Sequence, residues 1–196
     1  RLVICSRLIQ HCFPFCSDKM LEYLLDQEVS PNTRDPETGE TLLYIAVTKK
    51  DSKGANILIS HGADVHLIGG QHGTALHGAA VSGSWKTVEL LLSAGADINA
   101  RGGDYGTPLV AVMAQKWRET CWKAEFDMSC SWECHRCVAR VLLEWDADVD
   151  AEGEFGTALQ AAEKVGNEVG MKMLTGENEV LVEGGEGKDS DFEDSD

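Results

Sequence analysis

Four cysteines lie close together in the chain, and their spacing comes nearest to that of a chemical site. Cys121, Cys130, Cys134 and Cys137 end in a Cys-x-x-Cys pair, and four thiolates can hold Zn²⁺ in a tetrahedron. However, gaps of 8, 3 and 2 residues do not form the two matched pairs of a typical zinc site. We therefore expect thiols that pack in the protein, and zinc binding stays open as an alternative.

His77 has the residue type of a general base or a metal ligand. Its position recurs along the chain, and the equivalent residues are Tyr44, Val110 and Gln160. Because these residues share no acid–base chemistry, we predict that His77 makes structural hydrogen bonds. We predict no catalytic residue, no metal and no cofactor, so the chain is not expected to be an enzyme.

Two glycine-rich stretches, residues 69–73 and 102–106, superficially suggest a nucleotide-binding loop. A phosphate-binding loop follows a strand, whereas no strand is expected before either stretch. Both recur with the same spacing as the His77 position. We expect hairpin turns in which glycine supplies a positive φ.

The net charge disfavours several classes of partner. The 196 residues carry a formal charge of −16. Residues 177–196 contain nine acids and one lysine, which gives −8, so the other 176 residues carry the remaining −8. An acidic surface repels phosphate backbones, and the chain has no apolar run long enough to span a bilayer. We expect no nucleic-acid or membrane binding, and an acidic disordered tail over residues 177–196.

The cysteine count bears on the compartment. Seven cysteines, an odd number, without a secretion signal favour reduced thiols over a disulfide framework. We expect an intracellular protein, either cytoplasmic or nuclear.

Two short motifs recur in fixed register and indicate a repeat. A Gly-Thr-like motif places threonines at 41, 74, 107 and 157, with spacings of 33, 33 and 50 residues. A Gly-Ala-Asp motif follows 21 residues later in the first two units, and Asp146-Ala147-Asp148 follows 39 residues later in the third. The third unit therefore carries 18 extra residues, at about 118–135. Periods near 33 residues are typical of helical solenoids.

These motifs resemble those of ankyrin repeats, and the best match is Thr74 to Ala100, with its Thr-Ala-Leu-His start and Gly-Ala-Asp-Ile-Asn end. The resemblance implies an all-α solenoid of helix–turn–helix units joined by hairpin-like turns. It also implies that the chain binds another protein. The Gly-Gly-x-x-Gly-Thr turns are similar to those of large fungal ankyrin proteins, including some that follow a NACHT-type nucleotide-binding domain.

The register predicts the boundaries and the caps of the units. Threonine is a favoured residue before a helix, and Gly62 and Gly95 fall where a helix ends in a left-handed residue. We predict a degenerate N-terminal unit at 1–38, repeats at 39–71, 72–104, 105–154 and 155–176, and the tail at 177–196.

In ankyrin proteins the turns and the adjoining concave helix face usually hold the partner. His72, Tyr105 and Phe155 share the position two before the threonine, and we expect each to pack against the next unit. The other turn residues are the predicted contacts, namely Leu67, Ile68, Gln71, Arg101, Asp104, Glu152 and Glu154.

The insertion and its edges hold four of the five tryptophans: Trp117, Trp122, Trp132 and Trp145. We expect these rings to close an extended helical hairpin, with an exposed partner patch as the alternative.

The predicted function is a non-catalytic protein–protein interaction scaffold that is a fragment of a larger protein. The alternative is the sensor or autoinhibitory region of a NACHT-type signalling ATPase whose enzyme domain lies upstream. The missing initiator Met and the incomplete first unit motivate that alternative. A zinc-binding insertion is the third hypothesis. The oligomeric state is not predicted.

Overall fold

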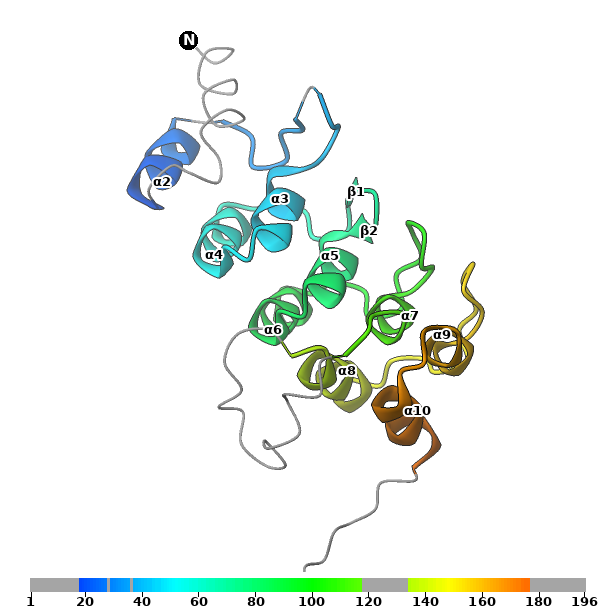
Figure 1. Cartoon of the computed structure of the whole chain (residues 1–196). Helices are drawn as coiled ribbons and strands as arrows, with labels where there is room; N and C mark the ends of the chain where they lie inside the picture. Colours follow the sequence, from blue (N-terminus) through cyan, green and yellow to red (C-terminus); the bar gives the residue numbers. More distant parts are fainter. Residues whose placement is uncertain (1–17, 28, 36, 118–133, 177–196) are drawn as a thin grey trace, which may run out of the picture.

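The computed structural model describes residues 18–27, 29–35, 37–117 and 134–176, and within them helical hairpins stack side by side in one row (Figure 1). The helices are α2 (Asp18–Asp26), α3 (Leu42–Thr48), α4 (Ser52–Ser60), α5 (Ala75–Ser82), α6 (Trp85–Ser93), α7 (Pro108–Met113), α8 (His135–Glu144), α9 (Ala158–Val165) and α10 (Glu168–Thr175). The strands β1 (Ile68–Gly70) and β2 (Gly73–Thr74) pair antiparallel in one of the turns.

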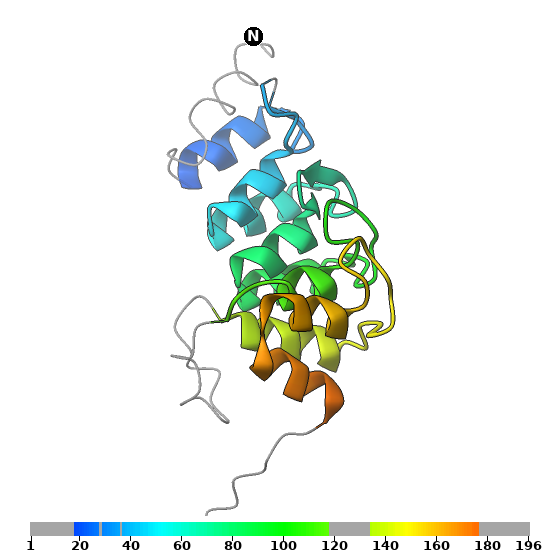
Figure 2. The same cartoon turned by 45° about the vertical axis from the view of Figure 1, so that its right-hand side comes forward.

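The helices form two layers. In the first layer α3, α5, α7 and α9 each contact the next, and in the second layer α2, α4, α6, α8 and α10 do the same. The turns that join successive units all project on one side of the stack (Figure 2). Through its contact with α4, α2 takes the place of a second helix in front of the repeat that begins at residue 39.

A threonine is the N-cap residue of each first helix. The side chains of Thr41, Thr107 and Thr157 accept hydrogen bonds from backbone N–H groups three residues later, at 3.2, 3.3 and 3.4 Å. These bonds satisfy donors that have no partner inside the helix. The caps predicted from the register are confirmed.

The second helices end in residues with positive φ. Gly62 and Gly95 have φ values of 84° and 88°, and Asp146 takes the same place in the third unit with a φ of 65°. Glycine adopts this conformation without steric cost, whereas an L side chain resists it. The predicted glycine caps are confirmed, and the third unit accommodates an aspartate in their place.

The core runs through the whole stack because each unit covers the apolar face of the next. Leu58, Leu91 and Leu142 each lie four residues before the positive-φ residue that follows α4, α6 or α8, and each is fully buried. Small residues such as Ala79 and Ala161 are also fully buried in the first layer, where they allow neighbouring helices to approach closely.

Side-chain amides connect one unit to the next. Asn32 Oδ1 accepts a hydrogen bond from the Asp64 N–H at 2.8 Å, and Asn99 Oδ1 accepts one from the Asp148 N–H at 2.9 Å. At the other end of the helices, Asn167 Nδ2 donates to the Met113 carbonyl at 3.3 Å. Each of these bonds joins a side chain of one unit to the backbone of an adjacent unit, so they connect neighbouring units at both ends of the helices.

The structure confirms the predicted fold class, an all-α solenoid. Most of the insertion and the whole acidic tail lie outside the described residues, so their predicted structure stays a prediction. Among the helices of the described part of the chain, none is both long and apolar enough to cross a membrane.

Candidate protein-binding surface

The seven residues predicted to contact a partner lie on three neighbouring turns, and together they are called the finger surface below. The first turn is the β1–β2 hairpin, and the others close through isolated bridges between Gly102 and Gly106 and between Gly153 and Gly156. All are exposed except Leu67, which is half-buried. Ile68 is 57% exposed, an unusually large fraction for an isoleucine.

A small hollow separates the first turn from the second. Its volume is about 260 Å³, and it is lined by Val65, His66, Ile68, Thr74, Asp97, Ala100 and Arg101. The hollow brings together two of the predicted residues, Ile68 and Arg101. Val65 and Ile68 give it an apolar wall, and Arg101 contributes a cation to its lining.

His66 and Asp97 line this hollow and were missed by the sequence analysis. His66 stands in the register position that Asn32 and Asn99 hold in the neighbouring units. In those units the asparagine bonds the turn of the next unit, whereas His66 is exposed beside the hollow. The sequence therefore contained a signal for this residue, because a histidine stands where the neighbouring units have an asparagine.

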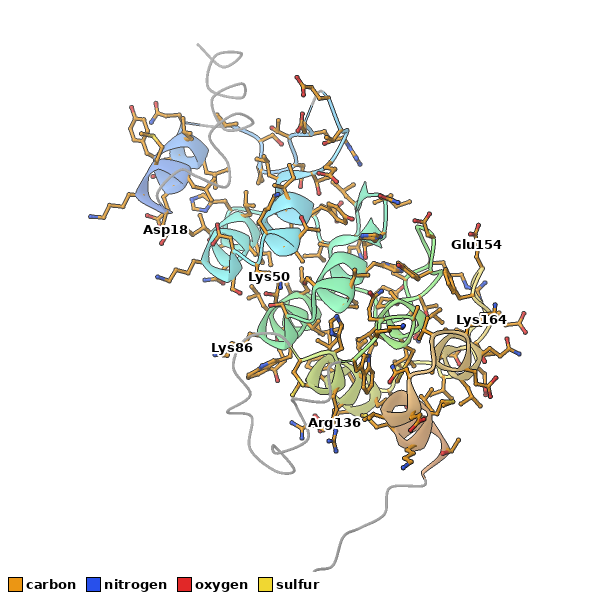
Figure 3. All side chains as sticks on the ribbon, viewed as in Figure 1. Asp18, Lys50, Lys86, Arg136, Glu154 and Lys164 are labelled. Carbon is orange, nitrogen blue, oxygen red and sulfur yellow. The ribbon has the colours of Figure 1, made fainter. Side chains whose placement is uncertain are left out.

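Two further finger residues are joined directly across neighbouring turns. Gln71 Nε2 donates a hydrogen bond to Asp104 Oδ2 at 3.3 Å. Glu152 and Glu154 lie on the third turn, away from the hollow, and Figure 3 shows Glu154 at the tip of that turn. The finger surface thus combines a hollow lined by both apolar and charged side chains with exposed carboxylates on the second and third turns.

Three neighbouring rings pack against one another and support the turns from behind. The ring centroids of His72 and Tyr105 are 5.7 Å apart, and those of Tyr105 and Phe155 are 5.2 Å apart. Lys164 Nζ donates to the Phe155 carbonyl at 3.1 Å and lies 5.8 Å from the centre of its ring. This confirms the prediction that the three rings pack between units, and it shows that they hold the turns at fixed spacing.

The first hairpin is also anchored to α3. The His72 N–H donates to the Tyr44 hydroxyl at 3.2 Å. Burial raises the pKa of that hydroxyl, so Tyr44 stays protonated at neutral pH. Gly69 and Gly70 are needed here because a Cβ on either would overlap the Tyr44 side chain. The glycine pair is therefore required for packing. The positive φ expected in these turns is found at Gly73, Gly103 and Gly106, whereas for Gly69 and Gly70 that prediction was wrong.

His77 connects the second and third units. Its Nδ1 accepts from the Thr74 N–H at 3.3 Å and lies 3.0 Å from the Thr74 hydroxyl, while Nε2 lies 3.1 Å from the Gly106 carbonyl. The side chain is fully buried, and this burial lowers the pKa of His77 although the Gly106 carbonyl opposes the effect. Both ring nitrogens are engaged, which confirms the structural role predicted for this histidine.

The cysteines are only partly described. Cys134 and Cys137 are buried at the start of α8, where the Cys137 N–H donates to Cys134 Sγ at 3.4 Å. Cys121 and Cys130 lie outside the described residues. Within the residues that the structure describes, no group of three or more His, Cys, Asp and Glu side chains could hold a metal ion. The zinc hypothesis requires all four cysteines and so stays a prediction.

The tryptophans at the edges of the insertion differ in their surroundings. Trp117 is half-buried and its Nε1 donates to the Val112 carbonyl at 3.0 Å, whereas Trp145 is 48% exposed at the end of α8. Trp122 and Trp132 lie outside the described residues. A shared aromatic cluster over the insertion stays a prediction.

Stacked helical hairpins with projecting turns define a class of repeat protein that presents one continuous surface. A family model of ankyrin repeats in three copies matches residues 8–102. The same helix–turn–helix unit continues to residue 176 in the structure. Residues 8–102 therefore consist of ankyrin repeats, and the resemblance that the sequence suggested is confirmed. No curated protein matches the sequence.

Proposed function

We propose that the chain is a non-catalytic interaction module whose finger surface holds another protein. Ankyrin repeats support a role in protein–protein interaction. The proposal rests on one observation: the backbone of the turns is held in place, while some of their side chains remain exposed. Stacked rings and hydrogen bonds fix the backbone, while Ile68 and Arg101 remain exposed around a hollow. A surface that is already ordered loses less conformational entropy when a partner binds.

The chemistry of the surface favours a partner with an apolar side chain next to basic residues. An apolar side chain would cover Ile68 and Val65, and burying a side chain of this size contributes about 1.5–3 kcal/mol. Asp104, Glu152 and Glu154 are exposed carboxylates, so basic residues of the partner would be attracted toward the second and third turns. Complementary charge of this kind mainly raises the association rate and the specificity.

A triple substitution tests this surface. Leu67→Ser, Arg101→Glu and Asp104→Lys change three finger residues without disturbing the buried core, and we expect partner capture to be lost with the melting temperature unchanged. Affinity capture with quantitative mass spectrometry and thermal unfolding measure the two effects. Asn56→Ala, Glu163→Lys and Lys172→Glu make a matched control, because all three side chains are exposed away from the fingers and the net charge change is the same. Proteins retained equally by all three versions would contradict the proposal.

The context of the module is a further part of the proposal. The Gly-Gly-x-x-Gly-Thr turns support a place in a larger protein, downstream of a NACHT-type ATPase as its sensor or autoinhibitory region. Extending the reading frame upstream tests this, and a start codon a few residues before Arg1 contradicts it.

The odd number of cysteines supports a cytoplasmic or nuclear location, and imaging of the tagged protein tests that. Elemental analysis of protein purified without chelator tests the zinc hypothesis, and metal-free protein contradicts it.

A further inference from the structure

The flank opposite the finger surface carries a regular series of cations. The second residue of three successive second-layer helices is basic, namely Lys53 in α4, Lys86 in α6 and Arg136 in α8, and Lys19 follows the first described residue of α2. The three lysines are exposed and Arg136 is half-buried. Figure 3 shows two of these residues, Lys86 and Arg136, on the side of the stack away from Glu154. We call Lys19, Lys53, Lys86 and Arg136 the cation column.

Cations near the N-terminal end of a helix are the opposite of the charge that this end favours. The N-terminal end of a helix carries a partial positive charge and favours acidic residues. In α4, α6 and α8 the first turn contains no acid, whereas the terminal helix α10 begins with Glu168. Intrinsic helix stability does not account for cations here, so an electrostatic role outside the helices is the simpler explanation.

Nearby groups leave most of this charge uncompensated. Within the described part of the chain, Lys19, Lys53 and Lys86 form no ion pair. Lys86 Nζ instead lies 5.4 Å from the centre of the Trp85 ring. Asp18 adjoins Lys19, and the Asp51 carboxylate accepts the Gly54 N–H at 2.9 Å at the start of α4. Lys49 is also exposed on this flank and adds further positive charge.

We propose that the cation column binds the chain's own acidic segment, residues 177–196. That segment has nine acids and one lysine, so its charge of −8 is opposite to that of the column. Glu183, Glu186 and Asp189 follow one another at intervals of three residues. Three extended residues span about 10 Å, which matches the spacing of about 8–10 Å between packed helices. An extended segment can therefore place one carboxylate beside each successive helix.

The length of the chain permits this placement. The segment follows Gly176, which caps the C-terminal end of α10, whereas the column lies at the N-terminal ends of the neighbouring helices. An eight-residue helix is about 12 Å long, and residues 177–182 can span about 20 Å. Six residues are thus enough to return along α10, and Glu183 then reaches the level of Arg136.

Carbodiimide cross-linking of the full chain tests this proposal, because the reagent joins a carboxylate to a lysine amine in contact with it. We expect cross-links from residues 183–196 to Lys53 and Lys86 in preference to Lys172, although Lys172 is much closer in sequence. Raising the salt concentration to 1 M shortens the Debye length from about 10 Å to about 3 Å and should abolish them. A mixture of isotopically labelled and unlabelled chains should show links within one chain. Links mainly to Lys172, links between chains, or links that persist in high salt would each overturn the proposal.

Paired charge reversals give a second, independent readout. Lys53→Glu with Lys86→Glu removes two members of the column, and acids suit these positions at a helix start, so the fold is retained. We expect a glutamate-specific protease to cleave after Glu183 and Glu186 several-fold faster in this variant. Lys164→Glu with Lys172→Glu changes the charge equally on the unit nearest the segment and should leave the rate unaltered. Equal cleavage rates in the two variants would refute docking on the column.

Discussion

The second repeat and the last repeat share one sequence pattern but differ in what covers them. Leu91 in α6 and Leu174 in α10 hold the same place in their units, yet Leu91 is fully buried and Leu174 is only half-buried. In α6 five residues are buried, whereas in α10 only Gly170 is. The second repeat has a neighbour on each side in the structure, while the described residues place a neighbour on only one side of the last.

The difference shows that burial in this protein is set by stacking as much as by the sequence of a unit. In a solenoid, stability is approximately the sum of each repeat's own stability and its contacts with the neighbouring repeats. A residue in a central repeat therefore contributes through two interfaces, and its equivalent in the terminal repeat contributes through one.

The largest expected effect comes from truncating the buried leucine. Leu91→Ala should lower the free energy of unfolding by about 2–5 kcal/mol, because it removes buried methyl groups and leaves a cavity. Leu174→Ala should cost clearly less, since its surroundings are partly solvent. Chemical denaturation of both variants measures the difference. Equal losses would show that the two repeats are equally enclosed.

The capping side chains provide the second contrast. His77 and Gln160 hold the same register position, and each bonds the N–H of the threonine that precedes its helix. His77 also reaches the Gly106 carbonyl of the next unit and is fully buried, whereas Gln160 is exposed. His77→Ala should therefore cost about 2–4 kcal/mol, because it leaves buried polar groups without partners, and Gln160→Ala should cost under about 1 kcal/mol. Similar losses of unfolding free energy in the two variants, measured with denaturant, would contradict this difference between His77 and Gln160.

The pH dependence of stability tests the structural role of His77. Burial lowers its pKa in the folded protein below the ordinary value of 6.5, so the unfolded chain binds the proton more readily. This stabilisation is fully present above pH 6.5 and is lost as the pH falls through the folded pKa. His77→Gln keeps a capping side chain and does not titrate. We expect wild type to lose more stability than this variant between pH 7 and pH 5. If the free energy of unfolding fell equally with pH in both proteins, the lowered pKa of His77 would be contradicted.

The smallest expected effect concerns the end of α8. Asp146 has a φ of 65° where the equivalent residues Gly62 and Gly95 have 84° and 88°. An L residue in this region is strained, and glycine relieves the strain at some entropic cost. Asp146→Gly should raise the melting temperature slightly, corresponding to about 0.5–1 kcal/mol. A lower melting temperature would mean that the Asp146 side chain stabilises the turn.

The features that repeat in the sequence could be predicted, because each is fixed by its place in one unit. The threonine caps, the glycine ends and the packing of His72 on Tyr105 all follow from the register. The hollow could not be predicted in the same way. Its lining comes from two turns, and its size depends on their separation.

The cation column escaped prediction for a related reason. Lys53 and Lys86 are 33 residues apart, as the repeat requires, but Arg136 follows Lys86 by 50 residues because of the insertion. The place of Arg136 depends on the residue at which α8 begins, and the boundaries of helices are hard to read from a sequence. The structure shows that α8 begins at His135, which puts Arg136 in the second position.

The central claim is that the finger surface holds the partner, and photo-cross-linking tests it most directly. A photoreactive amino acid placed at Ile68 lies beside the hollow, and the same group placed at Asn56 lies exposed on α4, away from the fingers. After irradiation in cells, we expect a defined protein adduct from position 68 and none from position 56. The same adduct from both positions, or an adduct from position 56 alone, would contradict it.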